Sequence, residues 1–294
     1  MKRANKVIIF GGSGFLGRYI IDELIKKNFY VVNFDKQKIP FKYKKLSFIK
    51  GDIKNYKLVE KAIKGSKYVI NLAGISDIGV SLKKPVETVK TNILGTINIL
   101  EACKKFKIKK HIFASTVYVL SSQGGFYRTS KHSGELYIQE YKKRYNLNFT
   151  IIRYGSIYGE GASNKNGITK IIYHSLKKGE LKYTGTKRAV RSFIHAKDAA
   201  RLTLKTLSNK YSNKSILITG SSKVRIMDLM KYLKKKLGIQ KKLVYSNKTE
   251  LGHYDRNPYS YKKIKNKTLK PRNNKNFKNN LDKLIKYLKN EQIR

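Results

Sequence analysis

A short apolar run that ends in spaced glycines constrains this chain more than any other feature of its 294 residues. The run, 7–10 (Val-Ile-Ile-Phe), has the length of a buried strand, and Gly11, Gly14 and Gly17 follow it. An amphipathic stretch over 15–27 then carries apolar residues at helical spacing. A strand that feeds a glycine turn opening into a helix can hold a pyrophosphate on its backbone amides.

The second strand completes this pattern. Gly11 would make the turn, Gly14 would let the backbone approach phosphate, and Gly17 would let the helix pack on the strand. A second apolar strand, 30–34, ends in Asp35, 18 residues beyond Gly17. A carboxylate there accepts hydrogen bonds from the adenosine ribose hydroxyls of NAD. Strand, glycines, helix, strand and acid in this order predict a dinucleotide site.

Strand-like and helix-like segments alternate along the first half of the chain, which predicts an α/β fold: a Rossmann-type, doubly wound parallel sheet with helices on both faces. The pattern loosens after about residue 160. We therefore expect an NAD-binding domain over 1–160, with later segments returning to it, and a smaller C-terminal part over 161–294. The expected strands are 6–10, 30–34, 46–49, 67–72, 110–114, 149–154, 215–219 and 242–245. The expected helices are 14–27, 55–64, 84–106, 126–145, 167–178, 226–237 and a terminal one with Leu281, Leu284, Ile285 and Leu288 on one face; the polar segment 255–280 is expected to be irregular.

The chain is strongly basic, with 66 Lys and Arg against 18 Asp and Glu and a formal net charge of +48. Such an excess fits nucleic acid or an anionic membrane as partner, but it also fits compositional drift, because the lysines are dispersed and Trp is absent. We expect no specific nucleic-acid site. In either interpretation the positive field would favour phosphorylated substrates at low salt.

The remaining composition bounds the location of the protein. No apolar stretch approaches 18 residues, so we expect no membrane span, and the four-residue run behind the basic start is too short for a signal peptide. Cys103 is the single cysteine, which excludes an internal disulfide and fits a cytoplasmic location. We expect no metal site.

A second informative pattern is 126–131 (Phe-Tyr-Arg-Thr-Ser-Lys), inside a predicted helix. Tyr127 and Lys131 are four positions apart and therefore share one face of that helix. A free tyrosine has a pKa near ~10, so acting as a base at neutral pH requires a fall of about three units, roughly 4 kcal/mol. The Lys131 ammonium and a positive nicotinamide ring could supply much of that fall. The spacing alone is common in surface helices, but behind the glycine turn it indicates a catalytic pair.

With both patterns in place, the chain resembles the extended short-chain dehydrogenases/reductases of the nucleotide-sugar epimerase/dehydratase family, from Val7 to about Lys263. The resemblance implies NAD as cofactor, a nucleotide sugar held mainly by the C-terminal part, a role in surface-polysaccharide or nucleotide-sugar metabolism, and a homodimer formed through 84–106 and 126–145. Segments 11–17, 51–53, 71–74 and 91–96 match the family at its glycine turn, adenine contact, cofactor loop and supporting asparagine. The residues thereby implied at the cofactor are Gly11, Ser13, Gly14, Phe15, Leu16, Gly17, Asp35, Asp52, Ile53, Leu72, Ala73, Gly74, Asn92, Tyr127, Lys131 and Tyr154.

The resemblance also implies a catalytic triad. Segment 113–118 (Phe-Ala-Ser-Thr-Val-Tyr) matches the strand that supplies the family's catalytic hydroxyl. Alignment on Phe113 gives this role to Thr116, with Ser115 beside it, and Tyr127 and Lys131 complete the triad.

Three further segments concern the substrate. Segment 153–159 resembles Arg-x-x-Asn-x-Tyr-Gly, with Ser156 where the family usually has asparagine. Segment 191–198 resembles one whose arginine, here Arg191, grips the nucleotide diphosphate, as a bidentate guanidinium suits. The implied substrate contacts are Thr116, Ser156 and Arg191. Segment 258–262 (Pro-Tyr-Ser-Tyr-Lys) resembles a motif of polysaccharide-locus members.

The reaction is left open between neighbouring chemistries. Dehydratases of the family usually carry Asp-Glu directly after the catalytic threonine, whereas this chain has Val117-Tyr118. We therefore favour an epimerase that oxidises a sugar carbon transiently, as in a UDP-hexose 4-epimerase. A ketosugar reductase would use the same triad. A cofactor-sensing or nucleic-acid-binding protein on a retained Rossmann fold is the non-enzymatic alternative.

Single residues have alternatives as well. Lys36 could receive a 2′-phosphate and so favour NADP. Asn92 could be a buried hydrogen-bonding residue, and His195 is interpreted as structural rather than as a base. Asp198 is expected to cap a helix that starts at Ala199.

Overall fold

An eight-stranded sheet forms the centre of the computed structural model, which describes residues 5–38, 40, 43–164, 166–246, 251–253, 267–271 and 277–292. Every neighbouring pair of strands in it is parallel, which confirms the predicted doubly wound α/β fold. The strands are β1 (Lys6–Phe10), β2 (Tyr30–Asp35), β3 (Leu46–Lys50), β4 (Tyr68–Asn71), β5 (Lys110–Thr116), β6 (Phe149–Tyr154), β11 (Lys214–Ile218) and β14 (Lys267–Leu269), and their order across the sheet is β14-β11-β6-β5-β4-β1-β2-β3.

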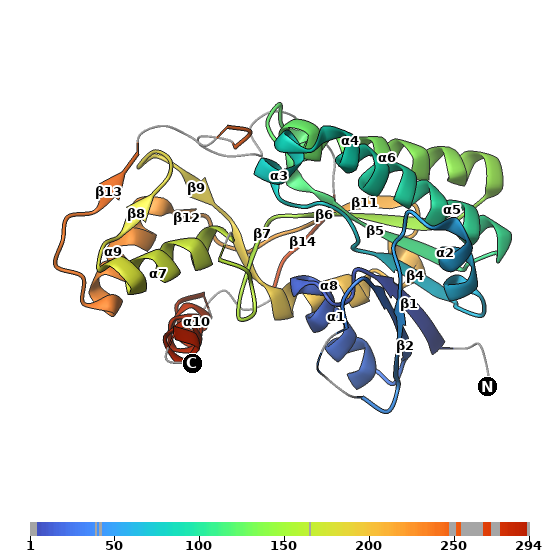
Figure 1. Ribbon diagram of the computed structural model, residues 1–294, viewed down its shortest axis with the longest axis horizontal. Helices are drawn as coiled ribbons and strands as arrows, with labels where there is room; N and C mark the ends of the chain where they lie inside the picture. Colours follow the sequence, from blue (N-terminus) through green and yellow to red (C-terminus); the bar gives the residue numbers. More distant parts are fainter. Residues whose placement is uncertain are drawn as a thin grey trace.

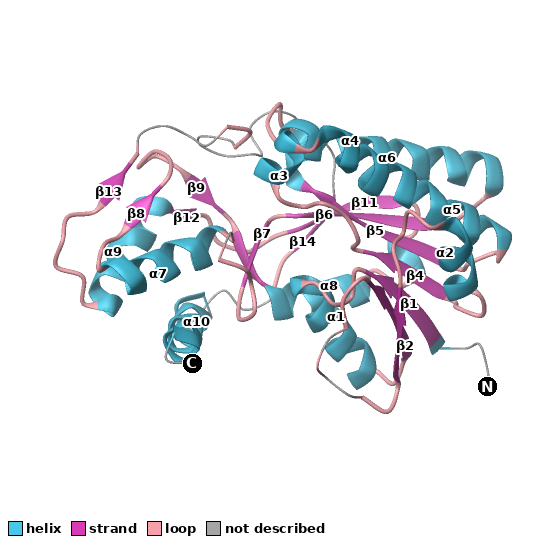
Figure 2. Ribbon diagram, viewed as in Figure 1, coloured by secondary structure: helices cyan, strands magenta, loops and turns pink. Residues whose placement is uncertain are grey.

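Helices cover both faces of this sheet (Figures 1 and 2). The alternation of side chains along β1 explains why both faces are apolar: Ile8 and Phe10 join one buried cluster, while Val7 and Ile9 join the other. One face is covered by α2 (Tyr56–Ile63), α3 (Ile78–Lys83), α4 (Pro85–Thr88), α5 (Gly95–Lys105) and α6 (Gly125–Tyr145), and the other by α1 (Phe15–Lys26) and α8 (Ala196–Lys205).

A smaller group of elements lies beside the sheet, at the left of Figure 1. Its helices are α7 (Gly167–Lys178), α9 (Ile226–Leu237) and α10 (Phe277–Gln292), and Ile172, Met230 and Leu233 are buried between them. The expected apolar face of the terminal helix is confirmed, because Leu281, Leu284, Ile285 and Leu288 are buried in the same cluster. Three short strand pairs complete this part: β7 (Ser156–Tyr158) with β10 (Phe193–His195), β9 (Val190–Arg191) with β12 (Val224–Arg225), and β8 (Lys182–Tyr183) with β13 (Val244–Tyr245).

The structure differs from three of the sequence expectations. Segment 255–280 is not wholly irregular, because it contains β14, a three-residue edge strand too short to show alternation, and the start of α10. The expected helix 84–106 contains a π-helical turn, η2 (Val89–Leu94), between α4 and α5. Helix α8 begins at Ala196, and His195 rather than Asp198 caps it by accepting from the Lys197 amide. The resembling segment 258–262 lies outside the described residues.

None of the helices in the described ranges is long and apolar enough to cross a membrane.

A buried lysine ties the sheet to α8. Lys110 of β5 is 1% exposed, and its Nζ donates to the carbonyl oxygens of Thr206, Leu207 and Ser208 at 3.1, 3.2 and 2.7 Å. These carbonyls follow the last turn of α8, where helix acceptors lack partners. Burial lowers the pKa of Lys110 to about 8.

We expect Lys110→Met to lower the free energy of unfolding by about 1–3 kcal/mol, because buried carbonyls would lose their donor. Lys109→Met is the matched control, since Lys109 is exposed on the neighbouring position, and a change within about 0.5 kcal/mol is expected there. Urea denaturation of both variants measures the difference. Equal stability of the two variants would show that the Lys110 contacts contribute nothing.

Candidate active site

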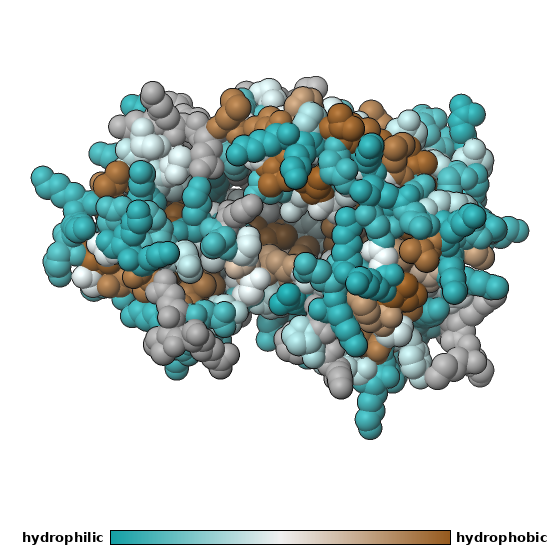
Figure 3. Space-filling view, in the orientation of Figure 1, coloured by the Kyte–Doolittle hydropathy of each residue, from teal (hydrophilic) through white to brown (hydrophobic). Residues whose placement is uncertain are grey.

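A cleft of about 1810 Å³ runs between the carboxyl ends of the sheet strands and the smaller group of helices. Figure 3 shows this hollow, with apolar atoms in its floor and hydrophilic side chains around it. Parallel α/β sheets bind their ligands at this edge. The predicted residues that line the cleft are Gly11, Ser13, Gly14, Phe15, Leu16, Gly17, Asp35, Asp52, Ile53, Leu72, Ala73, Gly74, Thr116, Tyr127, Lys131, Tyr154, Ser156 and Arg191. Asn92 is the one predicted site residue that does not.

The glycine turn between β1 and α1 leaves no room for side chains. Gly11 has φ +81°, and a Cβ there would lie 2.8 Å from the Ala73 nitrogen. A Cβ on Gly17 would lie 2.5 Å from the Gly12 carbonyl oxygen. The N-cap of α1, Gly14, provides no side-chain acceptor for the first amides of the helix. Bare helix amides facing a cleft fit a pyrophosphate.

Two carboxylates line the cleft near the glycine turn, one at the end of β2 and one just after β3. Asp35, at the end of β2, accepts from the Ser13 amide at 3.0 Å and from the Gln37 amide at 3.1 Å. Asp52 forms an ion pair with Lys36 at 2.9 Å. Burial acts to raise the pKa of Asp52, but the contact with Lys36 helps to hold it below its usual range. The ion pair also draws Lys36, the residue that could favour NADP, toward another carboxylate.

The proposed triad is assembled from β5 and the first turns of α6. Tyr127 and Thr116 both line the cleft, and Thr116 lies close enough to act on the pKa of Tyr127. Lys131 follows one turn later, is 5% exposed, and has no hydrogen bond from its Nζ to any described residue. Its Nζ lies 4.9 Å from the centroid of the Phe113 ring. A buried ammonium without an acceptor fits a ligand that supplies hydroxyl oxygens, such as a ribose.

Burial sets the pKa values of the two titratable members. It raises the pKa of Tyr127, and the nearby Thr116 hydroxyl opposes this only in part. Burial lowers the pKa of Lys131 to about 8, although Glu135 acts in the opposite direction. The protein by itself therefore keeps Tyr127 protonated at neutral pH. A further positive charge in the cleft is needed before it can serve as a base.

A buried ion pair behind Lys131 fixes α6 to the sheet. Glu135 receives hydrogen bonds from Arg153 of β6 at 3.0 Å (Nε) and 2.5 Å (Nη2), and from the Ser115 hydroxyl at 2.5 Å. Ser115 therefore points away from Tyr127, whereas Thr116 points toward it, as neighbours in a strand must. The sequence interpretation missed Glu135, although its spacing of four from Lys131 puts both residues on one helix face.

Asn92, in the π-helical turn, uses its side-chain amide in hydrogen bonds to other residues of the protein. Its amide nitrogen donates to the Ile75 carbonyl at 3.0 Å and the Ser130 hydroxyl at 2.9 Å, and its oxygen accepts from the Ile75 amide at 2.7 Å. Both amide hydrogens are thus used. The contacts connect the loop after β4 to the residue beside Lys131, so Asn92 supports the cleft from behind.

The opposite end of the cleft is cationic. Arg191 of β9, Lys170 of α7 and Lys182 of β8 line it, and none of the described lining residues on these segments carries a carboxylate. His174 of α7 also lines this end and pairs with Glu180 at 3.0 Å. Asn166 and Gly167, at the N-terminus of α7, also face this end. Such a surface suits an anionic ligand group.

Two residues of the resembling segments have polar groups that are bound to other parts of the protein. The Tyr154 hydroxyl pairs with the Thr203 hydroxyl of α8 at 2.6 Å. His195 pairs through Nε2 with Glu160 at 3.0 Å, while Nδ1 caps α8. His195 is therefore held in a structural network. No cluster of three or more His, Cys, Asp or Glu side chains suited to a metal occurs within the described ranges.

Comparison with known proteins assigns this arrangement to a family. Residues 7–219 match the model of the NAD-dependent epimerase/dehydratase family, so the chain belongs to that family of enzymes. A protein of Methanocaldococcus jannaschii that is provisionally named a UDP-glucose 4-epimerase is 28% identical over 305 residues, covering 97% of this chain and 98% of the relative.

Solved structures show the same fold. The UDP-glucose 4-epimerase of Thermotoga maritima, solved with UDP-glucose, has a TM-score of 0.83 at 23% identity and covers 98% of this chain and 99% of its own. The dTDP-glucose 4,6-dehydratase of Bacillus anthracis, solved with NAD, has a TM-score of 0.82 at 20% identity and covers 99% and 98%. Epimerases and dehydratases are thus both among the similar proteins.

Lys131→Met should stabilise the cofactor-free protein, because it removes a charge that the fold desolvates. The fall of the Lys131 pKa from 10.5 to about 8 corresponds to about 3 kcal/mol at 1.36 kcal/mol per pKa unit. Between these two values the unfolded chain binds more protons than the folded one, so wild-type stability rises with pH there. The advantage of the variant is therefore full below pH ~8 and fades toward pH ~10.5.

Denaturant unfolding at pH 7 and pH 10, paired with NAD titration, tests this expectation. NAD affinity should fall in the variant. Lys143→Met, an exposed position of the same helix, should change neither quantity. A Met variant less stable than wild type at pH 7 would contradict the desolvation argument.

Proposed function

We propose that this protein is an NAD-dependent nucleotide-sugar epimerase that inverts C4 of a UDP-hexose, as a UDP-hexose 4-epimerase does. The observation that carries the proposal is the meeting of Thr116, Tyr127 and Lys131 at the middle of one cleft, with a glycine turn at one end and a cationic wall at the other. The proposed roles extend the sequence prediction to these side chains.

Tyr127 acts as the base in this proposal. Its phenolate would take the proton of the C4 hydroxyl, and Thr116 would hydrogen-bond the reacting oxygen and pass the proton on. When bound, NAD would supply the hydride acceptor and donor at the sugar carbon. Because burial raises the pKa of Tyr127 in the protein alone, the base becomes active only when further positive charge is present beside it.

Lys131 links the base to the cofactor. Its Nζ lies close to the cofactor loop, since a Cβ on Gly74 would be 3.4 Å from it. The proposed role of Lys131 is to hold ribose hydroxyls and to lower the pKa of Tyr127 through its charge. The glycine turn would bind the pyrophosphate, and Asp35 would accept from the adenosine ribose, where its charge would repel the 2′-phosphate of NADP.

The C-terminal part, 161–294, would hold the nucleotide sugar. Arg191 is proposed to bind the diphosphate, with help from Lys170 and the N-terminus of α7, and Ser156 is proposed to contact the substrate beside it. With the base near the middle of the cleft, the sugar would then lie between the diphosphate and the nicotinamide.

Epimerisation is favoured over two related reactions. Val117 and Tyr118 stand where dehydratases of the family usually carry Asp and Glu, so the side chains for elimination are missing. A ketosugar reductase is the remaining alternative, since it would need the same triad and would consume reduced cofactor.

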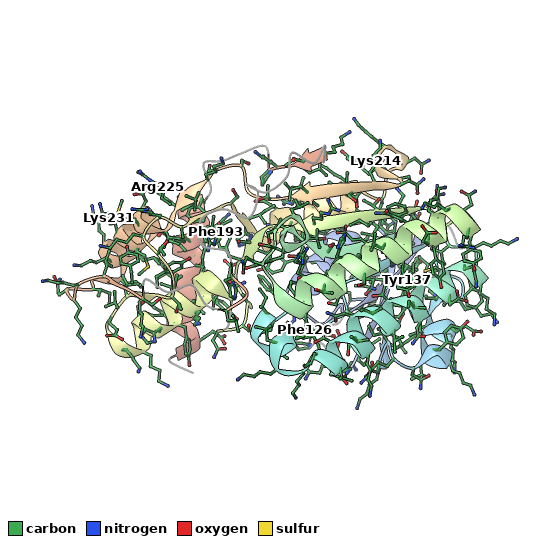
Figure 4. All side chains as sticks on the ribbon, turned by 90° about the horizontal axis from the view of Figure 1, so that it is seen from above. Phe126, Tyr137, Phe193, Lys214, Arg225 and Lys231 are labelled. Atoms are coloured by element: carbon green, nitrogen blue, oxygen red, sulfur yellow. The ribbon has the colours of Figure 1, made fainter. Side chains whose placement is uncertain are left out.

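We further propose a homodimer. Seven of the eleven exposed large apolar side chains among the described residues lie on two stretches, α4 through α5 and α6. Figure 4 looks down on α6, where Phe126 and Tyr137 are labelled. Exposed apolar side chains gathered on neighbouring helices mark an interaction surface. The seven are Val86, Val89, Leu94, Phe126, Leu136, Tyr137 and Tyr145.

Incubation with UDP-glucose, UDP-galactose and their N-acetyl forms should give an equilibrium mixture of the C4 epimers with no net consumption of added cofactor, followed by NMR. Tyr127→Phe should lower turnover by about 10²–10⁴-fold and leave NAD affinity nearly unchanged. Tyr30→Phe, exposed at the start of β2, is the control. Stoichiometric oxidation of NADH or NADPH with a ketosugar would replace the epimerase by a reductase, and a 4-keto-6-deoxy product would make it a dehydratase.

The dimer is tested separately by light scattering during size-exclusion chromatography. Leu136→Glu should give a monomer at micromolar concentration, because a charge would be buried in the interface. Leu58→Glu, on exposed α2, should remain dimeric. A wild-type monomer over the same range would contradict this proposal without bearing on the reaction.

A further inference from the structure

Residues 251–253 reach the catalytic helix from far along the chain, and we refer to them as the strap. The Gly124 amide, just before α6, donates to the Gly252 carbonyl at 2.7 Å. Gly252 also packs closely on α3, since a Cβ there would lie 2.7 Å from Ile78. The strap is therefore seated between two helices of the sheet half, and its residues Leu251 and His253 line the cleft.

The strap meets the active site through Tyr118. The Tyr118 hydroxyl and His253 Nδ1 are 2.9 Å apart, and their rings pack edge to face at 6.1 Å. The Tyr118 ring also packs edge to face on the Tyr127 ring, with 6.4 Å between the centroids. Tyr118 also lines the cleft. One residue thus stands between the strap and the proposed base.

The order of these groups along α6 indicates which ligand they face. The strap and Tyr118 lie at the N-terminal end of the helix, Tyr127 follows, and Lys131 comes one turn later. Lys131 is the member that lies beside Gly74 on the cofactor loop. Since the cofactor side is the Lys131 side, the Tyr118 side is the one left for the sugar.

The chemistry of the pair fits a sugar. A phenol hydroxyl and an imidazole can each donate or accept a hydrogen bond, and every hydroxyl of a hexose does both. With a neutral imidazole, both side chains are uncharged. The pair therefore does not select a carboxylate or a phosphate. The hydrogen bond between the two directs the Tyr118 hydroxyl, so that a correctly placed sugar hydroxyl meets a pre-oriented partner.

We propose that Tyr118 and His253 form a hydroxyl-binding pair that recognises the hexose ring of the nucleotide sugar. The inference rests on the proposed function and deepens it, because it names the residues that distinguish the sugar from the nucleotide. The pair sets the specificity for the sugar and the position of the sugar ring. It takes no part in the proton transfer at the reacting hydroxyl. The strap thereby makes a segment distant in sequence part of the sugar site.

Calorimetric titration of the NAD-loaded protein with UDP-glucose and with UDP alone tests the pair. Tyr118→Phe keeps the ring that packs on Tyr127 and removes only the hydroxyl; His253→Ala removes its partner. Each change should weaken UDP-glucose binding by about fivefold to tenfold, the range of one neutral hydrogen bond, and leave UDP binding unchanged. Because the two side chains act as a unit, the double variant should bind UDP-glucose as tightly as the single variant with the lower affinity.

Tyr30→Phe, which removes an exposed tyrosine hydroxyl at the start of β2, is the matched control and should alter neither titration. In turnover, both site variants should raise KM for UDP-glucose and keep kcat within about twofold, as lost uniform binding does. Unchanged UDP-glucose affinity, or an equal loss of UDP and UDP-glucose affinity, would overturn the pair as a sugar contact. Wild-type protein that binds neither ligand would instead overturn the proposed function, and the pair's role with it.

Discussion

The Lys131 ammonium is buried without a hydrogen-bond acceptor among the described residues, and the surrounding structure holds it there. An unpaired buried cation is costly, so a fold retains one only when neighbouring contacts keep it in place. Here the Glu135–Arg153 pair fixes the next turn of α6 to β6, and Asn92 holds the preceding residue, Ser130. A positive charge is thereby held one helical turn from Tyr127 before any ligand arrives, which is the preorganisation that the proposed acid–base catalysis would need.

The parallel sheet explains why these groups meet. Strands β1, β4, β5 and β6 end at one edge, and each ends at or just before residues that line the cleft: the glycine turn, the cofactor loop, Thr116 and Ser156. The basic wall formed after residue 160 faces that edge from the other side. The large net charge of the chain therefore includes cations placed where an anionic substrate would bind, whatever the origin of the dispersed lysines.

Local features were predictable from the sequence, and contacts between distant segments were not. The glycine turn and the Tyr127–Lys131 spacing each depend on a few neighbouring residues, so their place on strand, turn and helix followed from the pattern. Strand β14 has only three residues and is held by backbone pairing with β11, so the alternation of apolar and polar residues could not predict it. The approach of His253 to Tyr118 spans 135 positions of sequence, and only the folded chain brings them together.

The central claim is that Tyr127, Lys131 and Thr116 reverse the configuration of one sugar carbon by removing and returning the same hydrogen. It is tested most directly with UDP-glucose that carries deuterium at C4, incubated with the protein in ordinary water. We predict UDP-galactose that keeps its deuterium at C4, because the transferred hydrogen never reaches solvent. Replacement of the label by solvent hydrogen, or conversion to product without inversion at C4, would contradict the account.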